Sequence, residues 1–85
     1  MQAEQIARIV WAADNAFDNV LGNTEIRKWT DLNTTEQAYQ AKSVQEEMVA
    51  IITGAYTPII NMPQIIIDRT KLRANIISTF ITHAS

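Results

Sequence analysis

Residues 3–21 read AEQIARIVWAADNAFDNVL, and their apolar side chains recur at intervals of three and four positions. That period predicts an α-helix with one face turned toward a core. The face comprises Ile6, Ile9, Val10, Ala13, Phe17, Val20 and Leu21. Phe17 lies in the middle of it, so we expect its ring to be buried. Gly22 follows the stretch and predicts the helix end, because glycine readily adopts the left-handed backbone found there.

A second helix is predicted from Thr34 to about Thr53, after a loop over residues 23–33 that contains Trp29. Residues 34–37 read TTEQ, which indicates a capping box in which a threonine oxygen accepts from a backbone N–H and Gln37 reaches back. Gly54 is the expected stop. The predicted inward face comprises Ala41, Val44, Met48, Ile51, Ile52 and Ala55.

Residues 56–62 contain Pro58 and predict an extended link, after which Pro63 suits the first position of a third helix that ends near Thr82. Its inward residues would be Ile65, Ile66, Leu72, Ile76, Ile77 and Phe80. The alternative is a short strand over residues 65–67 with the helix starting at Asp68. The helix is favoured, because a lone strand would have no partner. We therefore expect one all-α domain over residues 1–85, a compact bundle of about three helices.

Composition excludes several function classes. The chain has no cysteine, which removes disulfides, thiolate zinc sites and cysteine nucleophiles. Its net charge of -2 argues against general nucleic-acid binding. No stretch approaches the ~20 apolar residues of a membrane span, and the N-terminus lacks a signal-peptide pattern. We expect no membrane association and a cytoplasmic location, in a bacterial cell or a phage-infected host.

No residue pattern indicates catalysis, a cofactor or a metal, so the expected class is a non-enzymatic binding module. The single histidine, His83, lies near the chain end and is expected in solvent. Asp14 and Asp18 share one helix face. They are interpreted as a solvated acidic stripe, with a divalent cation site as the alternative.

A ligand site is predicted around the two tryptophans. An indole can stack on a planar compound, and Arg27 and Lys28 directly precede Trp29. The C-terminal third is also richer in bases than acids, which indicates either an ordinary mixed surface or a local anion site. The ligand would be an anionic small molecule such as a nucleotide. The predicted ligand-binding set is Arg8, Trp11, Arg27, Lys28, Trp29 and Arg73. The alternative is that both indoles cover the edge of a thin core.

Isoleucines crowd around the two prolines, and three short helices cannot easily bury all of them. The predicted interface set is Ile59, Ile60, Ile65, Ile66 and Ile67. Exposed aliphatic side chains at this density indicate a contact with another copy, and hence a homo-oligomer. An equally weighted alternative is that the link folds back and buries these side chains against the core.

Three segments also carry a family resemblance. The first segment holds Ile6-Ala7-Arg8-Ile9, Ala13, Ala16-Phe17, Leu21-Gly22, Trp29 and Asp31. The second, in the predicted second helix, is marked by Val44. The third holds Pro63, Leu72 and Ile76-Ile77. Their spacing resembles the RyR domain, the small domain repeated in ryanodine receptors that also occurs alone in bacterial and phage proteins. The chain departs from that pattern at Trp11 and Asp14, where the family usually has His and Asn, and its middle segment is shorter.

The resemblance implies a binding module without established catalytic residues. Some bacterial relatives are thought to work in nucleotide-signal systems, so it also implies a nucleotide-like ligand. Two functions follow as hypotheses. The first is self-association and protein interaction through the isoleucine-rich link. The second is binding or sequestration of a nucleotide-derived signalling ligand, for example in phage counter-defence.

Overall fold

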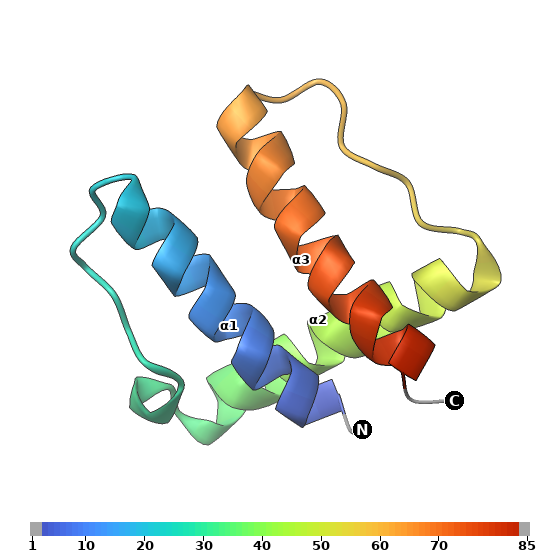
Figure 1. The fold of residues 1–85 in the computed structure, drawn as a ribbon. Helices are drawn as coiled ribbons and strands as arrows, with labels where there is room; N and C mark the ends of the chain where they lie inside the picture. Colours follow the sequence, from blue (N-terminus) through green and yellow to red (C-terminus); the bar gives the residue numbers. More distant parts are fainter. Residues whose placement is uncertain (1–2, 84–85) are drawn as a thin grey trace.

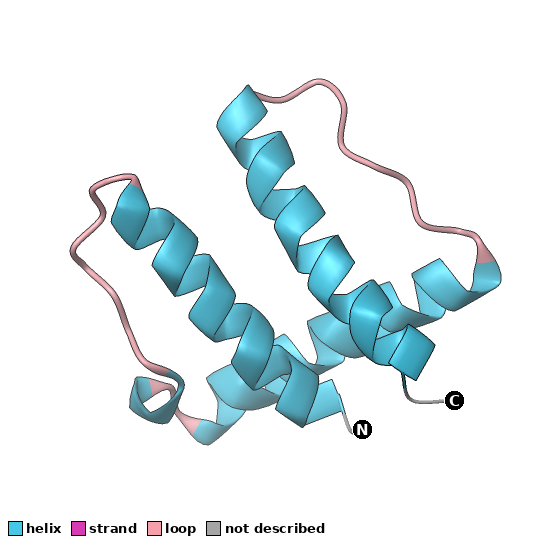
Figure 2. Cartoon of the chain, in the orientation of Figure 1, coloured by secondary structure: helices cyan, strands magenta, loops and turns pink. Residues whose placement is uncertain are grey.

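The computed structural model describes residues 3–83 and contains three α-helices and one short 3-10 helix. The helices are α1 (Ala3–Val20), α2 (Thr34–Thr53) and α3 (Gln64–His83), and the 3-10 helix η1 (Trp29–Asp31) lies between α1 and α2. Figure 2 shows the same elements by type. Residues 3–83 contain no strand, so the all-α bundle and the favoured helix over residues 65–67 are confirmed. No helix within this range combines the length and the apolar character that a membrane span requires.

Local signals fix the helix ends. Gly22 and Gly54 adopt positive φ angles of 93° and 75°, and each follows a helix C-terminus as predicted. The capping box of α2 lies one residue earlier than expected. The Asn33 side chain accepts a hydrogen bond from the backbone N–H of Glu36 at 2.8 Å, and the Glu36 side chain accepts from the N–H of Asn33 at 3.1 Å. Asparagine caps at least as well as threonine, so Asn33 takes the position predicted for Thr34.

Helices α1 and α3 run antiparallel, and α2 crosses both of them (Figure 1). The crossing lies near the N-terminal half of α1 and the C-terminal half of α3. The core forms there, from side chains that are at most 2 % exposed: Ile6, Ala7, Val10, Val44 and Ile77. Trp29, Met48, Ile51, Ile76 and Phe80 are partly buried against this cluster.

The predicted inward faces are only partly correct. Phe17 is half-buried and lies outside the core cluster, because α2 does not extend under the C-terminal half of α1. At the end of that helix Val20 is 86 % exposed. Ile65 and Ile66 were expected inward from α3 but are 41 % and 36 % exposed, since they lie in the first turn, far from the crossing.

Candidate functional site

The isoleucine-rich link presents apolar side chains to solvent. We define the link patch as Ile59, Ile60, Met62, Ile65 and Ile66, whose exposed fractions are 41, 77, 49, 41 and 36 %. The link runs along the outer side of α3 (Figure 2), so it does not fold back over the core. Ile67 is half-buried. Together with Ile59 it lines a hollow of about 190 Å³ between the link and α3, beside Tyr56 and Lys71.

The two tryptophans occupy different environments. The Trp11 indole N–H donates to the backbone carbonyl of Arg27 at 2.7 Å, and the side-chain amide of Asn15 donates to the same oxygen at 2.8 Å. These bonds tie the loop before η1 to α1. Trp29 packs against the core, and its buried N–H finds no acceptor among residues 3–83. The Arg8 guanidinium lies 5.9 Å from the centroid of the Trp29 ring, in reach of a cation–π contact.

Most of the predicted cations already have anionic partners. Arg27 binds both carboxylate oxygens of Glu36, at 2.8 and 2.9 Å. These bonds, together with the Asn33 N–H, lower the pKa of Glu36 to about 2, and they raise the pKa of Arg27. Arg8 pairs with Glu4 at 3.3 Å. Lys28 has an exposed side chain.

Arg73 lies apart from the other five predicted ligand residues, in an ion network that joins all three α-helices. Its Nε donates to Glu47 of α2 at 2.6 Å, and its Nη2 donates to the Ser43 hydroxyl at 3.2 Å. Both Arg73 and Arg69 approach the Asp14 carboxylate of α1, at 3.9 and 3.7 Å. Arg69 and Arg73 therefore serve ion pairs between the helices, whereas Lys71 is exposed.

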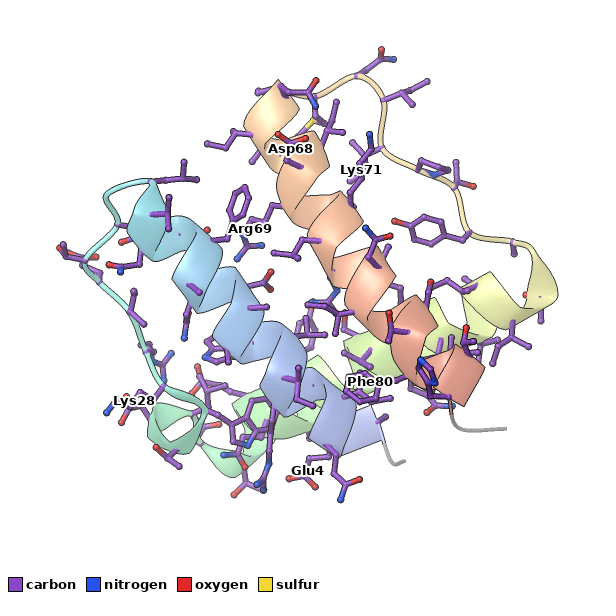
Figure 3. The ribbon with its side chains drawn as sticks, viewed as in Figure 1. Glu4, Lys28, Asp68, Arg69, Lys71 and Phe80 are labelled. Carbon is purple, nitrogen blue, oxygen red and sulfur yellow. The ribbon has the colours of Figure 1, made fainter. Side chains whose placement is uncertain are left out.

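Asp14 and Asp18 do not form the solvated stripe that was expected. Asp14 is only 6 % exposed, and its Oδ1 accepts no hydrogen bond from any described residue. Burial raises the pKa of Asp14, and the nearby Arg69 and Arg73 oppose that rise. Asp18 receives two hydrogen bonds from Arg69, at 3.0 and 3.2 Å, and Figure 3 shows Arg69 between α1 and α3.

The sequence held a signal for this network, because two acids four residues apart on one helix match two arginines four residues apart on another. Residues 3–83 contain no group of three or more His, Asp or Glu side chains arranged to hold a metal ion. The cation alternative for Asp14 and Asp18 therefore has no support from the geometry.

A second hollow, of about 330 Å³, lies between α1 and α2. We call it the Trp11–Tyr39 hollow, and its lining is Trp11, Leu32, Thr35, Glu36, Tyr39 and Gln40. Tyr39 is 70 % exposed, and Leu32 is 6 % exposed. Sequence reasoning missed Tyr39. Its signal was an aromatic side chain outside the apolar face of the second helix.

Comparison with protein-family models, with curated proteins and with solved structures finds no match for this chain. The resemblance to RyR domains stays a prediction.

Proposed function

We propose that this protein is a non-enzymatic binding module that acts by self-association and protein interaction, with the link patch as the contact surface. The observation that carries the proposal is the run of exposed aliphatic side chains from Ile59 to Ile66. Fully burying an isoleucine is worth ~1.5–3 kcal/mol. Several such side chains in one short segment offer enough free energy to offset the entropy lost on association.

The total exposed surface is large enough to include an uncovered interface of the size that two copies of the chain would bury. A folded monomer of 9.6 kDa is expected to expose ~5,100 Å². This chain exposes 5925 Å². The excess, on the order of 800 Å², equals the area that each partner buries in a standard protein–protein interface. The radius of gyration is 13.1 Å, against ~12 Å for a chain of this length.

A two-fold arrangement uses the features that lie beside the patch. In such a contact a residue of one copy covers a second position on the other copy, and the same pair forms again across the axis. Ile60, the most exposed member at 77 %, would then cover the hollow beside Ile59 on the other copy. Lys71 lies on the side of α3 that faces the link, and Asp68 is exposed on the same helix one turn earlier (Figure 3). They supply opposite charges for the rim of a symmetric contact.

The test is light scattering coupled to size-exclusion chromatography on the parent and on Ile60→Glu. Two buried isoleucines are lost per dimer, so the dissociation constant should rise at least 100-fold. Val20→Glu is the matched control, because Val20 is 86 % exposed and lies outside the patch. Circular dichroism should show all three proteins equally helical. A parent that is monomeric at micromolar concentration refutes the proposal, as does equal dissociation by both variants.

The second candidate, a binder of an anionic nucleotide-derived ligand through the predicted arginine and tryptophan set, has weaker support. Arg27 and Arg73 are engaged by Glu36 and Glu47, so a phosphate would have to displace a carboxylate from each. The RyR resemblance is consistent with a binding module of either kind.

A further inference from the structure

We infer that the Trp11–Tyr39 hollow is a binding site for one uncharged planar heteroaromatic ring. The site is separate from the link patch, since its lining belongs to α1, α2 and the segment before α2. It also differs from the anionic site predicted from the sequence. Of the six residues in that set, only Trp11 lines the hollow.

Size and lining define the ligand class. Pockets for small molecules have volumes of ~300–1,000 Å³ and combine apolar or aromatic walls with a few polar groups. At about 330 Å³, this hollow suits a single ring system. Trp11 and Tyr39 supply two aromatic walls, and Leu32 supplies a buried apolar contact. An aromatic side chain as exposed as Tyr39 gains most from a flat partner stacked against it.

Two of the lining side chains, Trp11 and Glu36, are held in place before a ligand arrives. The Trp11 ring is oriented by its 2.7 Å hydrogen bond to the Arg27 carbonyl. The Glu36 carboxylate is held by two bonds from the Arg27 guanidinium and by the Asn33 N–H. Binding therefore needs little further ordering of these two side chains, which favours affinity for a small ligand.

Within residues 3–83, the lining of the hollow offers an anionic ligand no free cation. Glu36 is ionised at neutral pH, and its bonds from Arg27 and the Asn33 N–H lower its pKa further, to about 2. Among residues 3–83, neither a lysine nor an arginine lines the hollow. A phosphate would therefore lie beside a carboxylate that already occupies the nearest cation, Arg27, and would have to displace it to gain a positive partner. A ring N–H can instead donate to Oε2 of Glu36, and the Gln40 amide and Thr35 hydroxyl can both donate and accept at a ring edge.

The experiment is titration of uniformly ¹⁵N-labelled protein with adenosine, uridine and indole, followed by ¹H–¹⁵N correlation spectra. The chain has two tryptophans, so Trp29→Phe assigns the two indole N–H signals. We expect at least one of the three compounds to shift the Trp11 indole signal and leave the Trp29 signal in place. AMP shares its ring with adenosine and adds negative charge, so it should bind more weakly than adenosine.

Tyr39→Ala should weaken binding about fivefold or more, the loss expected for one stacked aromatic ring. Val49→Ala is the matched control, since Val49 is 48 % exposed on the same helix and does not line the hollow. The inference is overturned if all three compounds leave the Trp11 signal unchanged, if AMP binds at least as tightly as adenosine, or if the two alanine variants behave alike. Each of these outcomes is independent of the oligomeric state.

Discussion

Replacing Arg73 by methionine tests whether the three-helix ion network holds the bundle together. The Arg73 side chain is 18 % exposed, and it faces Glu47 and Asp14, whose side chains are 15 % and 9 % exposed. Methionine keeps much of the aliphatic volume and removes the charge. The two carboxylates then lose their shared cation while they remain largely out of water. Breaking a buried pair in this way costs ~3–5 kcal/mol, out of a total stability of ~5–15 kcal/mol for a small domain.

Urea unfolding followed by circular dichroism, at one fixed protein concentration, measures that loss. The midpoint for Arg73→Met should fall by about 2 M, given slopes of ~1–3 kcal/mol per M for small proteins. Arg8→Met is the control, because Arg8 pairs with Glu4 at the surface and should lose only about 1 kcal/mol. Adding Glu47→Gln to Arg73→Met should recover part of the stability, since it removes an uncompensated charge. Equal losses for Arg73→Met and Arg8→Met would refute the reasoning.

Three further predictions concern the core, one titrating group and one helix end. Ile77→Ala should lower the free energy of unfolding by ~2–5 kcal/mol, because Ile77 is 0 % exposed. Phe17→Ala should lower it by only about 1–2 kcal/mol, because Phe17 is half-buried. Urea unfolding of both variants checks this order, and the reverse order would contradict it. The raised pKa of Asp14 makes the folded state hold a proton that the unfolded chain releases, so the contribution of Asp14 to stability decreases as pH rises from 3.8 through the folded pKa. In a pH series of unfolding curves, the stability of the parent relative to Asp14→Asn should therefore fall as pH rises over that window, and a constant difference would exclude the effect. Gly54→Ala should cost ~1–2 kcal/mol from its φ of 75° alone, since a Cβ there would meet no atom within 4 Å; thermal melts that match the parent would argue against this.

Sequence reasoning located the helices well because their ends depend on neighbouring residues. Gly22, Gly54 and Pro63 are local signals, and each marks a helix boundary in the structure to within a residue or two. The N-cap of α2 was predicted at Thr34 and lies at Asn33. This local error arose because asparagine and threonine cap helices with similar strength.

Burial was harder to predict, because it depends on where one helix crosses another. The period of the first helix predicted that Phe17 and Ile6 would be equally buried. In the structure, α2 covers only the end of α1 that holds Ile6. Asp14 lies between these residues in sequence and is buried, since arginines from α3 approach it. A single helix pattern cannot contain that information.

The candidate sites divide in the same way. Exposed isoleucines near the prolines could be predicted by comparing their number with the number that three short helices can bury. That comparison does not require knowing how the helices are arranged. The Trp11–Tyr39 hollow depends on how α1 meets the start of α2. The pairing of Arg27 with Glu36 depends on the course of the loop between them. No pattern within one segment predicts either arrangement.

The make-up of the core has a consequence for how the chain folds. Its apolar cluster takes Ile6 and Val10 from the beginning of the chain, Val44 from the middle and Ile77 from near the end. No two neighbouring helices can complete that cluster, because each contributes only one to three of its members. The core is therefore complete only when all three helices have docked, which favours a single cooperative transition. A fragment lacking any one of the three helices should be unfolded in isolation.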